Sequence, residues 1–258
     1  MIRKGQAGNQ FMEQENMREL QGHAVEYADG DTNFEGYVVV RDKVAANRAC
    51  VVLTHDWSGL TDPTKGLAAR YAALGCVCFA LDVYGKGVRG DPIGDNSHLM
   101  NPLIEDRALL RRRLLAGYNA ARQFSSVDAE RMAVVGYCFG GTCALDLARA
   151  KPPHLKAAVS FHGGLKSPDI EEDKPISASI LLLHGWNDPM APPEHVLGIA
   201  EELTAAEADW QLHVYGHAQH AFTFEDAKFP ERGIVYDRKA DERSWAAMRH
   251  HLDSSLGG

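Results

Sequence analysis

Short apolar runs alternate along the chain with longer amphipathic segments. Runs rich in Val, Leu and Ala are typical of strands that a parallel sheet buries on both faces. Such runs predict strands at residues 49–54, 76–81, 132–135, 157–161, 180–183 and 210–214. Apolar positions spaced three or four residues apart predict helices near residues 61–75, 101–124, 139–150, 194–204 and 241–252.

Two further strand-like segments lie near the amino terminus, at residues 23–27 and 35–40, with a turn-forming segment at 29–31 between them. This arrangement predicts an antiparallel hairpin. Strands that alternate with helices imply a mostly parallel sheet covered on both faces. We therefore expect a single three-layer α/β domain with about eight strands, over residues 21–258.

Residues 1–20 are polar and lack the apolar stretch of a secretory signal. We expect them to form an extension, either native and disordered or left over from cloning, that contributes little to the fold. The cytoplasm is then the default compartment, where thiols stay reduced. The five cysteines are an odd number, so at least one of them is free within a single chain.

Acidic residues outnumber basic ones by 35 to 27, which gives a formal net charge of −8. That balance argues against a nucleic-acid partner, whose phosphates need clustered Lys and Arg. One dense cationic run, residues 111–113, falls in a leucine-rich segment and is expected to be the solvated face of a helix. No apolar stretch is long enough to span a bilayer, so no membrane partner is expected.

The most informative segment joins the strand predicted at 132–135 to the helix after it. Its sequence GYCFG, residues 136–140, places small residues two positions before and two after Cys138. This is the pattern of a nucleophile elbow with Cys in place of Ser, because side chains at those positions would collide with the strand or the helix. A helix amino terminus also stabilises a thiolate. The alternative is a glycine-rich turn around a buried, unreactive cysteine.

The downstream sequence supplies an acid and a histidine in the order that this architecture requires. Asp188 follows the strand predicted at 180–183, and His220 follows the strand predicted at 210–214. Both lie just beyond the carboxyl ends of strands, where open α/β sheets bind ligands. We therefore predict that Cys138, Asp188 and His220 form one site.

Alternatives remain open for both partners. His217 competes with His220 as the base, although the apolar pair Ala221-Phe222 favours His220 by holding its loop in place. Asp188 also fits the role of an ordinary turn residue.

On these residues the chain resembles the dienelactone hydrolase family of α/β-hydrolases, over about residues 23–252. The resemblance rests on residues 136–141, 185–192 and 220–222. It implies the three-layer α/β-hydrolase fold, with Cys138 as nucleophile, Asp188 as acid and His220 as base, and it implies neither a cofactor nor a metal.

The resemblance further implies an acid that hydrogen-bonds the resting thiol, and two backbone N–H groups that bind an oxyanion. Asp56 stands where the family usually has Glu, and its side chain is one methylene shorter. The N–H groups of Trp57 and Phe139 would form the oxyanion hole.

Candidate substrate-binding residues follow from the same resemblance and from nearby aromatic residues. One cationic position of the dienelactone-specific members falls at Lys86, whereas a second falls at Phe224, which carries no charge. This departure favours an apolar ester over a dienelactone. Trp57, Trp186, Phe222 and Phe224 would line an aromatic pocket.

The expected function is hydrolysis of small-molecule carboxylic esters or lactones by a Cys-His-Asp triad, through a thioester acyl-enzyme, in a cytoplasmic monomer or homodimer. The alternative is promiscuous hydrolysis of activated aryl esters or phosphotriesters by the same triad. A metalloenzyme built on His213, His217 and His220 lacks a standard ligand spacing. A non-catalytic binding protein on the same scaffold is a further alternative. Residues 84–102 are expected to form a loop beside the pocket.

Overall fold

The computed structural model describes residues 19–41, 47–168 and 175–257. The extension predicted at residues 1–20 lies outside the described residues, apart from its last two positions. Leu20 already begins the first strand.

Within the described residues, eight strands form one sheet in the order β1-β2-β4-β3-β5-β6-β7-β8. The strands are β1 (Leu20–Asp29), β2 (Thr32–Arg41), β3 (Arg48–Thr54), β4 (Val77–Leu81), β5 (Val127–Tyr137), β6 (Leu155–Phe161), β7 (Ser179–Gly185) and β8 (Trp210–Tyr215). β2 pairs antiparallel with both β1 and β4, whereas all neighbours from β4 to β8 are parallel. The predicted mostly parallel sheet with an antiparallel hairpin at one edge is confirmed.

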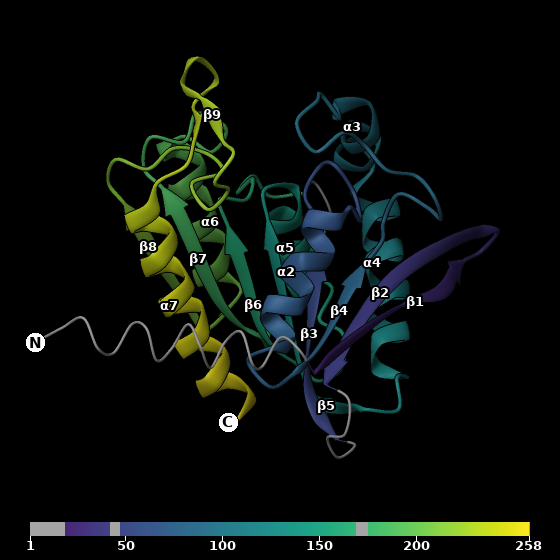
Figure 1. The fold of residues 1–258 in the computed structure, drawn as a ribbon. Helices are drawn as coiled ribbons and strands as arrows, with labels where there is room; N and C mark the ends of the chain where they lie inside the picture. The colour runs from purple at the N-terminus through teal and green to yellow at the C-terminus, as the bar shows by residue number, and fades with distance from the viewer. Residues whose placement is uncertain (1–18, 42–46, 169–174, 258) are drawn as a thin grey trace, which may run out of the picture.

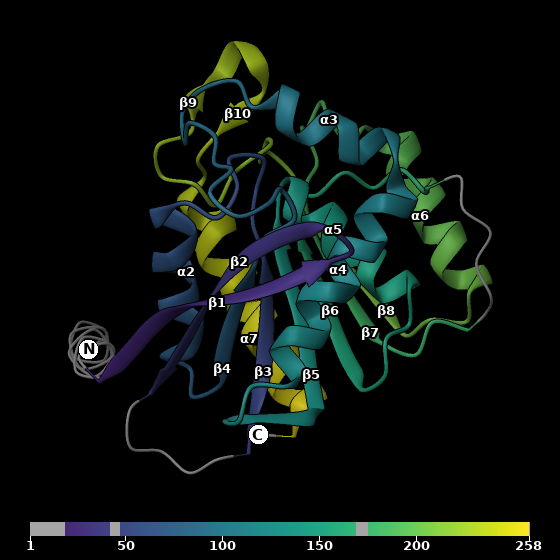
Figure 2. The ribbon, with the colours of Figure 1, turned by 90° about the vertical axis from the view of Figure 1, so that its right-hand side faces the viewer.

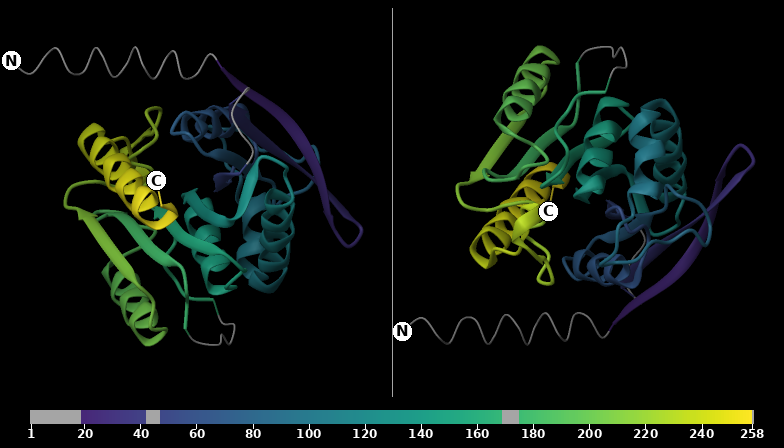
Figure 3. Two further views of the ribbon diagram at one scale, coloured as in Figure 1. Left: turned by 90° about the horizontal axis from the view of Figure 1, so that it is seen from below. Right: turned by 90° about the horizontal axis from the view of Figure 1, so that it is seen from above.

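Helices cover both faces of this sheet. They are α2 (Asp62–Ala72), α3 (Ser97–Glu105), α4 (Arg107–Arg122), α5 (Phe139–Arg149), α6 (Pro193–Ala205) and α7 (Arg238–Leu256). Figure 3 shows α2 and α7 on one side of the sheet and α4, α5 and α6 on the other. Tyr71 and Met248 belong to one buried core, and Leu114, Leu145 and Val196 to the other. The predicted three-layer arrangement is confirmed. In the described part of the chain, no helix is both long and apolar enough to cross a membrane.

The single helix predicted at residues 101–124 is wrong, because the chain breaks at Asp106 into α3 and α4. Asp106 has a non-helical backbone, and its carboxylate accepts a hydrogen bond from the Leu109 N–H at 2.9 Å. A short side chain that caps the second helix in this way satisfies an N–H group that would otherwise lack a partner.

The cationic run at residues 111–113 is only partly solvated. Arg112 is exposed and pairs with Asp29, as expected for a solvated helix face. Arg113 instead turns inward, donating to the Val83 carbonyl and lying over the ring of Phe34.

The carboxyl ends of the parallel strands meet at one end of the sheet. Register pairs Thr54 with Gly136 across β3 and β5, and Gly185 with Tyr215 across β7 and β8, so the loops that follow are neighbours. A two-stranded hairpin rises above this end, formed by β9 (Lys228–Phe229), η1 (Pro230–Arg232) and β10 (Ile234–Val235). Figures 1 and 2 show this hairpin and α3 above the same end of the sheet. The sequence did not predict the hairpin.

Candidate active site

Cys138 lies at the turn between β5 and α5. Its backbone φ of 56° falls in the left-handed region, which is uncommon for a residue other than glycine. The turn is too tight for larger neighbours: a Cβ atom at Gly136 would lie 1.9 Å from the Gly140 carbonyl oxygen, and one at Gly140 would lie 2.2 Å from that of Thr54. The small residues around Cys138 therefore have the steric reason that the sequence predicted.

The three residues predicted to act together form one hydrogen-bonded array. Cys138 Sγ lies 3.1 Å from His220 Nε2, and His220 Nδ1 lies 2.8 Å from Asp188 Oδ2. Asp188 and His220 are buried, whereas Cys138 is partly exposed and so is reachable from solvent. This is the geometry of a nucleophile, a base and an orienting acid.

The charges of the array act on His220. Burial alone would lower the pKa of this imidazole, but Cys138 and Asp188 outweigh that effect and raise the pKa of His220 to about 10. The imidazolium form is thus favoured at neutral pH.

Backbone contacts fix the loops that carry the acid and the base. The second oxygen of Asp188 accepts a hydrogen bond from the Met190 N–H at 2.8 Å. The His220 N–H donates to the Gly233 carbonyl at 2.9 Å, and the Val235 N–H donates to the His220 carbonyl at 3.1 Å. The β9–β10 hairpin thus satisfies both the backbone N–H and the backbone carbonyl of His220. His217 is exposed, so the geometry favours His220 between the two candidate bases.

The two residues predicted to supply oxyanion donors lie on neighbouring segments. Phe139 is the first residue of α5, so its N–H has no intrahelical acceptor. Trp57 lies on the loop after β3, which the sheet register places beside the elbow.

The Asp56 carboxylate is engaged by Ser58. One of its carboxylate oxygens accepts hydrogen bonds from the backbone N–H of Ser58 at 2.7 Å and from the Ser58 hydroxyl at 2.5 Å. Among the described residues, no hydrogen bond joins Asp56 to Cys138. The thiol contact that the resemblance implies is therefore not formed in this structure.

His162, on the loop after β6, is a candidate residue that the sequence analysis missed. Its Nδ1 accepts a hydrogen bond from the Cys138 N–H at 3.2 Å, and its Nε2 lies 2.8 Å from Thr223 Oγ1. Burial, and then the neighbouring His220, hold the pKa of His162 well below its usual range. The ring is therefore neutral, with its proton on Nε2, and it stands edge-on to His220 at 5.2 Å between centroids. His162 thus links the nucleophile turn to the loop after the base.

The contact of His162 with Cys138 becomes visible only in the folded structure. His162 follows the strand that neighbours β5, and it has an uncommon positive φ of 37°. The signal available in the sequence was a histidine directly after the strand predicted at 157–161.

The predicted substrate-binding residues occupy different surroundings. The Lys86 ammonium group pairs with Glu26 on β1. Phe222 is fully buried, with its ring edge-on to His162, so it supports the site from behind. Trp186 and Phe224 are 46% and 37% exposed, and both lie on loops that carry the array.

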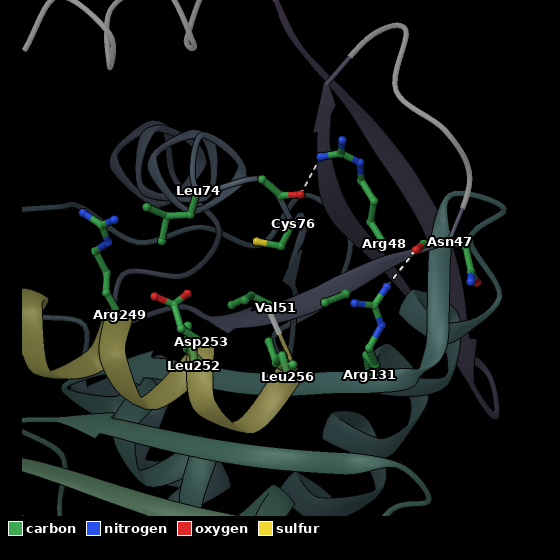
Figure 4. Close-up of a pocket in the computed structure, with 13 residues that line it drawn as sticks. Asn47, Arg48, Val51, Leu74, Cys76, Arg131, Arg249, Leu252, Asp253 and Leu256 are labelled. Atoms are coloured by element: carbon green, nitrogen blue, oxygen red, sulfur yellow. Dashed lines mark hydrogen bonds between the residues drawn. The ribbon is translucent and has the colours of Figure 1, made fainter. Parts of the chain in front are cut away.

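Two hollows lie away from the array. One, of about 440 Å³, is at the opposite end of the sheet, where Figure 4 shows Leu74, Cys76 and Leu252 around it. The other, of about 420 Å³, lies beside the junction of α3 and α4 and includes Arg107 and Lys166. In the ranges that the structure describes, no group of three or more His, Cys, Asp or Glu side chains is arranged to hold a metal.

Known proteins resemble this chain along most of its length. A putative carboxymethylenebutenolidase of Yersinia pestis is 27% identical over 224 residues, covering 80% of this chain and 82% of that protein. A probable 2-oxo-3-(5-oxofuran-2-ylidene)propanoate lactonase of Bradyrhizobium is 27% identical over 246 residues, covering 89% and 95%. The crystal structure of a dienelactone hydrolase-like promiscuous phosphotriesterase from metagenomic libraries superposes with a TM-score of 0.87 at 33% identity, covering 92% of this chain and 99% of that one.

A family model agrees with these likenesses. The model of the dienelactone hydrolase family matches residues 34–256, which include the elbow, the acid loop and the histidine loop. The chain is therefore a hydrolase with the α/β-hydrolase fold and belongs to the dienelactone hydrolase family.

Proposed function

We propose that this protein hydrolyses carboxylic esters or lactones by nucleophilic attack of Cys138. The observation that carries the proposal is the array in which His220 contacts Cys138 Sγ at 3.1 Å and Asp188 at 2.8 Å. The names of the relatives from Yersinia pestis and Bradyrhizobium, a butenolidase and a lactonase, support the same substrate class.

In the first half of the reaction, the sulfur of Cys138 attacks the carbonyl carbon of the substrate. A C–S bond forms while the carbonyl electron pair moves onto oxygen, where the N–H groups of Trp57 and Phe139 stabilise it. The tetrahedral intermediate collapses with loss of the alkoxide, which takes a proton from the His220 imidazolium. In a lactone the alcohol stays attached to the acyl chain.

In the second half, the neutral His220 accepts a proton from water as the water attacks the thioester. The C–S bond breaks, the acid is released, and the sulfur and imidazole return to their starting state. Asp188 keeps Nε2 of His220 directed at the sulfur throughout, and stabilises the imidazolium whenever it forms.

The proposal is tested by hydrolysis of a short-chain p-nitrophenyl ester by the wild type and by Cys138→Ala. We expect the variant to lose at least about 10³-fold in kcat/KM, as removal of a nucleophile does in comparable triads. Cys76→Ala is the matched control and should keep wild-type activity. An active Cys138→Ala variant would contradict the nucleophile assignment.

Activated phosphotriesters are a second candidate substrate class. The similar metagenomic structure is described as a promiscuous phosphotriesterase, and a thiolate beside oxyanion donors suits attack at phosphorus as well as at carbon. Turnover of paraoxon against turnover of p-nitrophenyl acetate, with the same leaving group, separates the two classes. We expect the carboxylic ester to be favoured in kcat/KM.

A further inference from the structure

The hollow of about 440 Å³ lies at the end of the sheet opposite the proposed active site (Figure 4). Its volume is within the range of small-molecule sites. Four segments line it: the start of β3, the turn between α2 and β4, part of β5 and the last turns of α7. None of the residues proposed for ester hydrolysis is among its lining residues, so any ligand here occupies a separate site.

Apolar side chains form the floor of this hollow. They are Val51, Leu74, Leu252 and Leu256. Three of them are buried, whereas Leu74 is 38% exposed. Removing apolar surface from water is favourable, so a ligand with an apolar body gains by covering this leucine.

Arginines stand on two sides of the apolar floor. Figure 4 shows Arg48 and Arg131 on one side and Arg249 on the other. Arg48 donates to the Gly75 carbonyl, and Arg131 donates to the Asn47 carbonyl at 2.9 Å. These hydrogen bonds hold two of the three guanidinium groups at the edge of the hollow.

The charges around the hollow do not cancel. Asp128 pairs with Arg131 at 2.8 Å. Within the described ranges, no carboxylate lies within 4.0 Å of Arg48 or Arg249, and no cationic group lies within 4.0 Å of Asp253, which also lines the hollow. Two unpaired arginines against one unpaired aspartate leave a positive charge among these residues, in a chain whose formal net charge is −8. The hollow therefore favours an anion over a cation.

Arg249 is the cation best placed to hold the negative group of a ligand. It is exposed on α7, and no described residue engages its five N–H donors. Residues three apart lie on the same side of a helix, so Arg249 stands beside the part of the floor that Leu252 forms. A guanidinium binds a carboxylate through two parallel N–H···O bonds.

We propose that this hollow binds an amphipathic organic anion, with its negative group on Arg249 and its apolar body over Leu74 and Leu252. The charge of Arg48 adds to the attraction, whereas that of Asp253 opposes it. Binding at this site does not depend on the proposed ester hydrolysis.

Two fluorescent probes with nearly the same apolar body test the proposal. 8-Anilinonaphthalene-1-sulfonate carries one negative charge, and N-phenyl-1-naphthylamine carries none. Both become brighter in apolar surroundings, so titration gives a Kd for each. We expect the wild type to bind the anionic probe. Added salt should weaken that binding, because it screens the charges, and should not weaken binding of the neutral probe.

Substitutions of opposite sign on α7 assign the binding to this hollow. Arg249→Gln should weaken binding of the anionic probe about three- to fivefold, whereas Asp253→Asn removes a repelling charge and should strengthen it about twofold. Neither should change the affinity for the neutral probe. Arg238→Gln and Glu242→Gln make the same charge changes at the other end of α7 and should leave both affinities unchanged.

A substitution of Leu74 tests the apolar floor. Leu74→Ser should weaken binding of both probes, whereas Leu197→Ser, at a more exposed leucine on α6, should weaken neither. All of the substituted side chains are exposed, so we expect the variants to keep the fold. A wild type that does not bind the anionic probe overturns the inference. Anionic binding that Arg249→Gln and Asp253→Asn leave unchanged, or that survives Leu74→Ser in full, also overturns it.

Discussion

Cys138 and Cys76 are both partly exposed, yet they stand at opposite ends of the sheet in opposite chemical surroundings. Cys76 precedes β4 and faces the hollow shown in Figure 4, where its thiol donates to the Tyr71 carbonyl at 3.3 Å. Burial raises the pKa of the Cys76 thiol to about 12. Cys138 instead begins a helix and contacts His220.

The difference shows that exposure alone does not make a cysteine a nucleophile. A thiol reacts as its thiolate, so the neighbours that stabilise the anion decide the outcome. Cys138 has a histidine with a raised pKa and a helix amino terminus beside it. At Cys76, burial of the thiol outweighs the backbone hydrogen bonds and the Arg48 charge that favour its anion. Substitution and chemical labelling test this contrast.

The largest effect is expected from Asp188→Asn, which leaves the size of the side chain unchanged but removes its charge. Without the carboxylate, His220 loses the partner that orients it and stabilises its imidazolium form, so kcat/KM for an aryl ester should fall by about 10³- to 10⁴-fold. Asp226→Asn, at an exposed carboxylate paired with Lys228, is the control. A loss below tenfold, in a variant with unchanged thermal stability, would remove Asp188 from the mechanism.

Alkylation by iodoacetamide compares the two cysteines directly. At pH 7.5 the thiolate of Cys76 is rare because its pKa is about 12, so Cys138 should be alkylated at least about 10³-fold faster. Peptide mass spectrometry over time measures both rates in one sample. His220→Ala should slow the reaction at Cys138 and leave that at Cys76 unchanged. Equal rates in the wild type would show that the array does not activate Cys138.

The sequence predicted the array because each member lies on the segment that follows a strand. Parallel strands bring their carboxyl ends to one edge, so Cys138, Asp188 and His220 could be placed together without any coordinates. The mostly parallel sheet and the three layers followed from the same alternation of apolar runs and amphipathic segments.

The features that the sequence did not reveal depend on contacts between distant segments. The strands of the β9–β10 hairpin have two residues each, too few for a periodic pattern, so the contacts of this hairpin with His220 could not be foreseen. The hydrogen bond between His162 and Cys138 exists only because β6 neighbours β5. The sequence predicted that Lys86 binds the substrate. In the structure its ammonium group pairs with Glu26 on β1, which forms the hairpin at the edge of the sheet.

A smaller effect is expected at His162, which we propose positions the nucleophile. His162→Phe removes one of the two acceptors of the Cys138 N–H, leaving the Phe161 carbonyl at 3.0 Å, and should lower kcat about tenfold with little change in KM. His162→Asn places an oxygen where Nδ1 stood and should restore much of the loss. Equal losses in both variants, or a change confined to thermal stability, would indicate a purely structural role.

The smallest effect concerns the pH profile of kcat/KM, which should stay flat around the usual pKa of histidine. Because the pKa of His220 is raised, its imidazolium form persists as pH rises through 6.5, and it is lost only as pH passes about 10. The pH profile of kcat/KM should therefore show no inflection near 6.5 and should decline near 10, where the proton for the leaving alcohol is lost. An inflection near 6.5 would indicate an ordinary neutral histidine that acts as a general base on a thiol.

The most direct test of the central claim is to trap the acyl-enzyme. Wild-type protein is quenched in acid during turnover of a slowly hydrolysed ester, digested, and analysed by mass spectrometry for the mass of one acyl group. We expect the acyl group on the peptide that contains Cys138, as a thioester that hydroxylamine removes. An acyl group on any other residue, or turnover with no acyl group on Cys138, would contradict the proposed mechanism.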